Sequence, residues 1–161
     1  MHVLNAAPRK LQKSDVSDYI RQFDQRSKLL LGIFERGTRS HVGFVRLDLD
    51  YEAGEALVSA IIGEADHRNR GANTDIFIPL LAFLFDTLGL ERVKASVLER
   101  NQVTLRYLLK LGWQKDATAE PPVRSQTDGT TLNRCSVSWT RDGFRGWLAS
   151  PLGARIRQRI A

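Results

Sequence analysis

The alternation of apolar and polar positions predicts one helix and then three strands in the N-terminal part of the chain. Apolar residues from Val16 to Phe23 follow the i, i+3, i+4, i+7 spacing of an amphipathic helix, which we expect over 15–24 with Ser14 as its N-cap. Short polar turns separate three further apolar runs, which favours an antiparallel meander. The predicted strands of this meander are 29–34, 42–49 and 56–62.

In the second half of the chain, helices and strands alternate. Gly89 and Gly112 mark the ends of two predicted helices, and Pro79 inside the first of them predicts a kink or a late start. A meander followed by such units predicts a mixed sheet covered by helices. The predicted elements are a helix at 74–88, a strand at 93–98, a helix at 103–111, a loop with Pro121 and Pro122, one or two strands ending with 133–140, and a helical tail from Gly143 that is interrupted at Pro151.

The composition is that of one globular domain, which we expect to span residues 1–161. Apolar residues make up 42% of the chain and charged residues 26%. The N-terminus lacks a signal-peptide pattern, and no apolar run approaches the roughly 20 residues that cross a bilayer, so no membrane partner is expected. The single cysteine, Cys135, indicates a reduced, cytoplasmic setting, and no zinc-ligand spacing predicts a metal site.

The chain is basic, with a formal net charge of +6 and a sequence pI of about 9.9. A basic protein attracts phosphates, either on nucleic acid or on a nucleotide cofactor. The positive charges are spread along the chain, and a concentration of arginines after Arg141 is also consistent with a solvated helix face.

The stretch from Ile61 to Thr74 combines the end of a strand, a basic loop and the start of a helix. Free backbone N–H groups at a helix N-terminus suit a pyrophosphate. Arg68 and Arg70 would add positive charge, and Gly71 would let the backbone approach the phosphates. Many strand-to-helix turns carry a glycine and an arginine, so this loop alone also fits an ordinary turn.

A second informative stretch runs from Val97 to Trp113. A strand ends, Asn101 begins a helix, and the sequence Leu-Gly-Trp closes it. Taken alone, Asn101 is interpretable as a plain N-cap, and Gly112 with Trp113 as a helix stop followed by a core aromatic residue.

Together, and in this order, the two stretches resemble the GNAT acetyltransferases, and the resemblance extends from about residue 29 to residue 140. The family's pyrophosphate motif, Gln/Arg-x-x-Gly-x-Gly/Ala, is similar to residues 68–73, with a departure at Asn73. Residues 61–64 and 74–75 resemble the branch that acts on ribosomal-protein N-termini, aminosugars and polyamines. The family's later motif matches, in register, Asn101, Thr104, Lys110, Gly112 and Trp113.

The resemblance implies an α/β (α+β) fold with a GNAT-like mixed, mostly antiparallel central sheet flanked by helices. The core would span 29–140 and a helical tail 141–161. The region before the first strand is shorter than is usual in the family. The chain is therefore interpretable as naturally short, as truncated, or as one whose site is completed by a partner subunit, for example a second copy in a homodimer.

The resemblance also implies acetyl-CoA as the co-substrate. The implied contacts are Ile61, Ile62 and Gly63 along the strand, Arg68, Asn69, Arg70, Gly71, Ala72 and Asn73 around the pyrophosphate, and Asn101 and Thr104 where the sheet opens. A backbone N–H near Ile62 would stabilise the developing oxyanion of the thioester carbonyl.

The catalytic groups are marked less clearly. Leu108 occupies the position of the tyrosine that serves as general acid in many family members. The adjacent Tyr107 should point about 100° away around the helix, toward the core or a neighbouring helix. The candidates for a base, or for a side chain that organises a water, are Glu64, His67, Asp48 and Ser96. Each is also interpretable as an ordinary surface or sheet residue.

The implied reaction is transfer of an acetyl group to a primary amine, on a peptide N-terminus, an aminosugar or another small amine, by direct attack on the thioester. The alternative is a GNAT-fold protein that binds acyl-CoA with little catalysis, as a sensor or structural subunit. A nucleic-acid-binding role for the C-terminal arginines has no motif to support it, and nucleic acid is not an expected partner.

Overall fold

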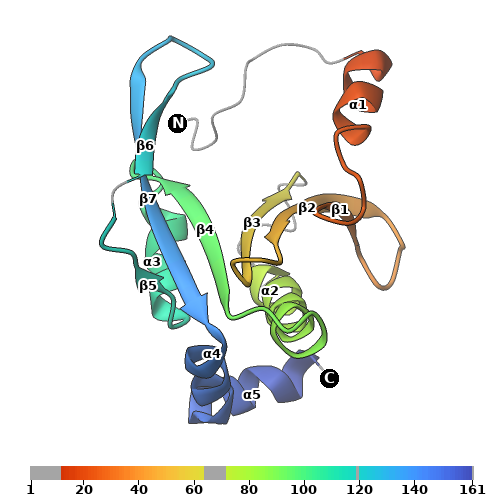
Figure 1. Ribbon diagram of the computed structural model, residues 1–161. Coiled ribbons are helices and arrows are strands. Elements are labelled where there is room, and N and C mark those ends of the chain that lie inside the picture. Colours follow the sequence, from red (N-terminus) through yellow and green to blue (C-terminus); the bar gives the residue numbers. More distant parts are fainter. Residues whose placement is uncertain (1–11, 64–71, 119, 161) are drawn as a thin grey trace.

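The computed structural model describes residues 12–63, 72–118 and 120–160. Figure 1 shows the strands side by side in one sheet, with α4 and α5 gathered at one end of it. The elements, in chain order, are α1 (Lys13–Ile20), β1 (Lys28–Phe34), β2 (His41–Asp50), β3 (Glu55–Ile62), α2 (Ala72–Ala82), a π-helical turn (Phe83–Thr87), β4 (Arg92–Leu98), α3 (Gln102–Lys110), β5 (Gln114–Lys115), β6 (Glu120–Arg124), β7 (Thr131–Thr140), α4 (Arg141–Ala149) and α5 (Pro151–Ile160).

The seven described strands form one mixed sheet in the order β1-β2-β3-β4-β7-β5, and β6 also pairs with β7. Among these strands β3 and β4 are the parallel pair, and the other pairs are antiparallel. The expected mixed, mostly antiparallel sheet flanked by helices is therefore confirmed. The three strands of the predicted meander are also confirmed, each end falling within one residue of its expected place.

One side of the sheet carries the apolar core. Successive side chains of a strand point to opposite sides, and on this side Leu47, Val93 and Val137 are fully buried. Helices α2 and α3 pack their apolar residues against these strands. The helical residues in this cluster include Phe77, Ile78, Leu81, Leu105 and Leu108. Burial of this apolar surface, at roughly 25 cal/mol per Å² removed from water, holds the helices on this side.

The opposite side of the sheet is polar over its central strands. Lys94 and Ser96 of β4 lie there, as do Ser136 and Ser138 of β7. Helix α1 reaches this side at β2, where the ring of Tyr19 lies 6.3 Å from that of Phe44. None of the described helices combines the length and the apolar character needed to cross a membrane.

Helix α1 differs from the prediction at both ends. It spans Lys13–Ile20, and its N-cap is Gln12 where Ser14 was expected. The reason is Asp15, whose carboxylate accepts a hydrogen bond from the Gln12 backbone N–H at 2.8 Å. A carboxylate in the first turn satisfies a free donor at the helix start, so this position decides where the helix begins.

The expected loop around Pro121 and Pro122 is wrong, because these prolines lie inside strand β6. The β6–β7 register shifts between Glu120 and Val123, so the two prolines sit at an irregularity of the ladder. A proline has no N–H to donate and is tolerated at such bulges. The two-residue strand β5 was not expected separately, so three strands follow α3.

Helix α2 runs through Pro79, which lies inside it and is exposed. The expected late start is wrong, because the helix begins at Ala72, and it widens after Ala82 into the π-helical turn Phe83–Thr87. The alternative, a kink at Pro79, stays a prediction. The predicted stop at Gly89 is consistent with its positive φ of 72°.

The helical tail provides a stability test at Gly153. A Cβ atom at this position would lie 2.1 Å from the carbonyl oxygen of Trp147. We expect Gly153→Ala to lower the free energy of unfolding by about 1–3 kcal/mol, because α5 must move away from α4. The matched control is Gly146→Ala in α4, where a Cβ would meet nothing within 4 Å. This control should stabilise by roughly 0.5–1 kcal/mol, since alanine favours a helix. Denaturant unfolding of both variants measures the difference, and equal effects would contradict the packing.

Candidate functional site

Strands β3 and β4 pair over a short distance and then separate. Their parallel register covers three residues of each strand, 55–57 against 92–94. Beyond that point β3 continues to Ile62 and β4 to Leu98, and Figure 1 shows the two ribbons diverging. Within the described part of the chain no strand fills the gap. The divergence therefore leaves two strand edges facing each other with space between them.

A cleft of about 410 Å³ occupies this space. Phe77 and Leu108 form an apolar floor from α2 and α3, and polar groups lie around the rim. Ligand pockets commonly combine such an apolar lining with a few placed polar groups. The lining residues used below are Ile61, Ser96, Asn101, Thr104, Tyr107 and Arg134.

Asn101 begins α3 at the rim of the cleft. Its side-chain oxygen accepts a hydrogen bond from the Thr104 backbone N–H at 3.3 Å, which is an N-cap contact. Asn101 and Thr104 both line the cleft. The capping role is therefore present, and the expected cofactor contact of the two residues stays a prediction.

Tyr107 joins α3 to the first turn of α2. Its hydroxyl lies 2.6 Å from the hydroxyl of Thr74, which is only 6% exposed. This contact with the neighbouring helix agrees with the orientation expected from the helical period. Leu108, at the position of the family's tyrosine, is 3% exposed and packs into the core.

Among the described residues, Ser96 is the one candidate catalytic side chain that lies in the cleft wall, and it is bonded to a carboxylate that the sequence did not reveal. Its hydroxyl donates to Glu120 Oε2 at 2.5 Å. Arg134 Nη1 lies 3.2 Å from the same Glu120 oxygen and 3.4 Å from Ser96 Oγ. Arg134 also donates from Nε to the Pro121 carbonyl at 2.9 Å, which fixes the guanidinium plane. The bulged start of β6 thus brings Glu120 into contact with Ser96, a residue of the cleft wall.

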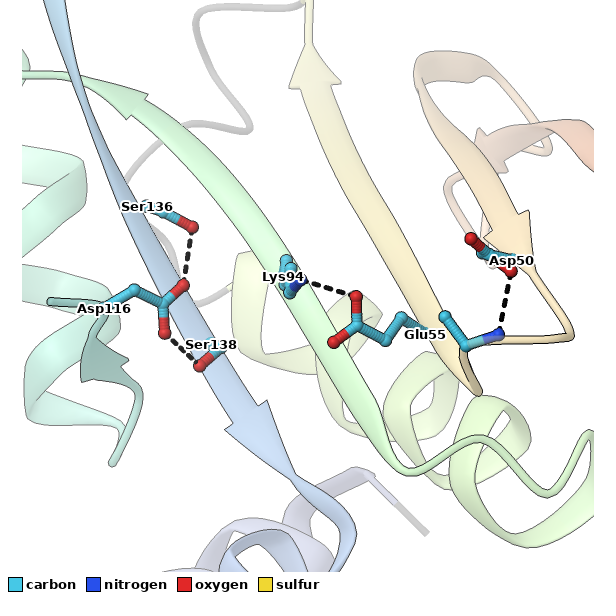
Figure 2. A network of polar contacts seen from close by, with 7 residues as sticks. Asp50, Glu55, Lys94, Asp116, Ser136 and Ser138 are labelled. Carbon is cyan, nitrogen blue, oxygen red and sulfur yellow. Dashed lines mark hydrogen bonds and ion pairs between the residues drawn. The ribbon is translucent and has the colours of Figure 1, made fainter. Parts of the chain in front are cut away.

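A larger hollow of about 880 Å³ lies beside β4, β5 and β7, and its lining includes several polar side chains of the open side of the sheet. The side chain of Asp116 lies against β7 there, and its carboxylate accepts hydrogen bonds from the hydroxyls of Ser136 and Ser138, each at 2.6 Å (Figure 2). Partial burial disfavours its ionised form, but the two serine bonds and the charges of Arg92 and Lys94 together hold the pKa of Asp116 below its usual value.

Lys94 is itself paired across the parallel strands. Its ammonium lies 2.5 Å from Glu55 Oε2, as Figure 2 shows. Glu120 lines the hollow, whereas Ser96 and Arg134 line the cleft. The three-residue contact of Ser96, Glu120 and Arg134 therefore lies between the two cavities.

The structure removes Asp48 from the candidate bases. In the β2–β3 register Asp48 is opposite Leu57, whereas Gly43 is opposite Ile62 at the open end. Asp48 also forms an ion pair with Arg46, with 2.7 Å between Arg46 Nη2 and Asp48 Oδ2. It therefore lies toward the end at which β3 and β4 are still paired. The strand itself was predicted correctly, but its register against the cleft was not available from the sequence.

The other expected contacts fall partly outside the described residues. Ile61 lines the cleft, Ile62 ends β3, and the Gly63 N–H donates to the Val42 carbonyl at 2.9 Å. Ala72 and Asn73 begin α2, and nothing is described of their side chains. The expected residues outside the described part are Glu64, His67, Arg68, Asn69, Arg70 and Gly71. Among the described residues, no group of three or more His, Cys, Asp or Glu side chains is placed to hold a metal ion.

A family model described as "Acetyltransferase (GNAT) domain" matches residues 2–114. The chain belongs to the GNAT acetyltransferase family. GNAT acetyltransferases use acetyl-CoA. The chain is also similar to "Probable N-acetyltransferase YjcK" of Bacillus subtilis (strain 168), with 27% identity over 116 residues that cover 70% of this chain. It spans 63% of that relative's length.

Solved structures share the fold. A crystal structure from T. thermophilus, named provisionally as an acetyltransferase, superposes with a TM-score of 0.75 at 19% identity, covering 98% of this chain and 80% of that one. The spermidine N-acetyltransferase of Vibrio cholerae, crystallised with CoA and spermine, gives a TM-score of 0.72 at 13% identity, covering 88% and 82%. At these identities the likeness concerns the fold.

The contact between Tyr107 and Thr74 separates a structural role from a catalytic one. Tyr107→Phe removes one partner of this bond and should destabilise the protein by about 1–3 kcal/mol. Its kcat should stay within a few-fold of the wild-type value, because Tyr107 is engaged with α2. Unfolding of Tyr107→Phe, Thr74→Val and the double variant should give a coupling energy between 0.5 and about 3 kcal/mol. A hundredfold fall in kcat with folding and acetyl-CoA binding intact would instead make Tyr107 catalytic.

Proposed function

We propose that this chain is an acetyl-CoA-dependent N-acetyltransferase, acting as one domain over residues 1–161, that acetylates a primary amine by direct attack on the thioester. The observation that carries the proposal is the cleft opened by the divergence of β3 and β4. Its walls are two strand edges, and Asn101 stands at its rim. An extended chain lying between such edges can hydrogen-bond to backbone groups as a further strand would.

The residues fit the parts of acetyl-CoA, which supplies a thioester carbonyl to be attacked. Ile61 and Ile62, at the end of β3, would bind the pantetheine arm, and a backbone N–H near Ile62 would hold the carbonyl oxygen. The segment 64–71 precedes α2 in the sequence, and α2 is an 11-residue helix that begins at Ala72. The start of this helix would take the pyrophosphate with the help of Arg68, Arg70 and Gly71.

The proposed acceptor is a primary amine on a small molecule, an aminosugar or a peptide. The Vibrio cholerae structure that shares the fold is named as a spermidine N-acetyltransferase and contains spermine, which supports an amine acceptor. The amine must be neutral to attack. At pH 7 this costs about 1 kcal/mol for an α-amine and roughly 4–5 kcal/mol for a lysine-like amine. A side chain that removes a proton therefore matters most for the second kind. We propose that the reaction takes place in the cytoplasm. We also propose that the protein assembles as a homodimer.

A second candidate is an acyl-CoA-binding protein with little catalysis. Leu108 favours it, because an apolar side chain fills the position of the family's general-acid tyrosine and is 3% exposed. Coenzyme A carries a thiol, as cysteine does, and a cysteine thiol has a pKa near 8.5, so the thiolate leaves without a dedicated acid. We therefore prefer the enzyme.

The test combines turnover and binding. Free thiol should appear when acetyl-CoA is mixed with at least one of N-terminal peptides, aminosugars, polyamines or amino acids. Acetyl-CoA without an amine should raise the melting temperature, because it binds the folded state. Thiol release with hydroxyl acceptors alone would contradict N-acetylation, and a melting shift without any release would favour the acyl-CoA-binding candidate.

A matched pair of variants tests the cofactor loop. Gly71→Asp should abolish the melting shift by placing a side chain and a negative charge at the pyrophosphate. Gly37→Asp makes the same change in an exposed turn where a Cβ meets nothing within 4 Å, and it should keep the shift. Equal shifts in wild type and Gly71→Asp would contradict the loop assignment.

A further inference from the structure

Glu120 is the carboxylate that the structure brings closest to the candidate chemistry, and no motif marks it in the sequence. It comes from β6, the strand with two prolines, and meets Ser96 of β4 across 24 positions of the chain. Its side chain is 20% exposed, and it lines the larger hollow. Glu120 thus contacts solvent on one side and the cleft wall on the other.

In its hydrogen bond with Glu120, Ser96 is the donor. The Ser96 hydroxyl donates to Glu120 Oε2 at 2.5 Å, so its proton is engaged and its oxygen can take part in further hydrogen bonds as an acceptor. The second contact, from Arg134 Nη1, is long at 3.4 Å. A hydroxyl that donates to a carboxylate is a better acceptor for an N–H group, because hydrogen bonds in a chain polarise one another. Ser96 is therefore set to accept a proton and to pass one on.

We propose that Ser96 and Glu120 form a proton relay that takes the proton of the attacking amine. This inference rests on the proposed function. As the nitrogen bonds to the thioester carbonyl carbon, its surplus proton moves to Ser96 Oγ while the Ser96 proton moves to Glu120 Oε2. When the C–S bond breaks, Glu120 returns the proton through Ser96 to the leaving sulfur. The sum is amine plus thioester to amide plus thiol, and both side chains end as they began.

Arg134 has a positioning role in this relay. Its Nε bond to the Pro121 carbonyl holds the guanidinium, and its Nη1 lies 3.2 Å from Glu120 Oε2. The arginine therefore keeps the carboxylate turned toward Ser96. The divergence of β3 and β4 leaves Ser96 in the cleft wall, since the parallel pairing ends at Lys94, two residues earlier on the same strand.

Asp116 provides a matched control on the same side of the sheet. It lines the same hollow as Glu120 and accepts hydrogen bonds from two serines, yet it does not line the cleft. Asp116→Asn and Glu120→Gln each remove one negative charge with little change of shape. A general electrostatic effect of the hollow would respond to both changes, whereas a relay responds to Glu120 alone.

The experiment measures kcat/KM against pH with a lysine-like amine that wild type acetylates. Glu120→Gln and Ser96→Ala should each lower kcat/KM at pH 7 by about 10²-fold, the effect of losing a proton-transfer group. The deficit should shrink to a few-fold near pH 10, because hydroxide takes over the proton. The double variant should lose no more than the worse single variant, since the two residues act as a unit. Asp116→Asn should stay within a few-fold at every pH, and all variants should keep the acetyl-CoA melting shift.

Three results would overturn the relay: a deficit that is the same at every pH, losses that multiply in the double variant, or an equal loss in Asp116→Asn. Wild type that shows neither thiol release nor a melting shift would instead refute the proposed function. An active wild type with an unaffected Glu120→Gln variant would refute the relay alone.

Discussion

The structure depends on the contact that holds β3 and β4 together at one end only, which we call the clamp. It consists of the short parallel pairing of the two strands and the hydrogen bonds to Gly54 just before it. Both the Glu91 and the Arg92 N–H groups donate to the Gly54 carbonyl, at 2.7 and 3.2 Å. The ion pair of Lys94 with Glu55 lies just beyond them, on the open side of the sheet. Gly54 has a φ of 66°, a conformation that glycine adopts at little cost, so the turn before β3 delivers this carbonyl. Past the clamp the strands are free to diverge.

A sheet that opens in its middle must be closed by other elements, and the two sides of this sheet do so differently. On the core side, Phe77 of α2 and Leu108 of α3 fill the base of the gap with apolar surface. The hydroxyl contact of Thr74 with Tyr107 then ties the two helices together. On the open side the gap is bordered by polar side chains that bond one another, Ser96, Glu120 and Arg134. The opening therefore has an apolar floor and a polar border.

The sequence predicted the helices and strands better than it predicted the register and contacts between them. Strand alternation and glycine stops are local signals, and they placed the meander and the ends of α3 within one residue. The contact of Ser96 with Glu120 is not local, because it depends on a bulge between Glu120 and Val123 that the two prolines made to resemble a loop. The prediction of Asp48 as a candidate base was wrong for the same reason. Its strand was predicted correctly, but its distance from the cleft follows from the register of β2 against β3.

The distribution of side chains agrees with the relative difficulty of the two proton transfers in amine acetylation. The leaving group of acetyl-CoA is a thiolate, and because thiols such as that of cysteine have a pKa near 8.5, it leaves at neutral pH without a dedicated acid. An alkyl amine with a pKa near 10.4 is mostly protonated at pH 7, and it must lose a proton to attack and another as the amide forms. The position that would serve the thiolate holds Leu108, which packs into the core. The carboxylate, hydroxyl and guanidinium of Glu120, Ser96 and Arg134 meet between the cleft and the larger hollow. In the proposed relay these polar groups serve the harder of the two steps, the deprotonation of the amine.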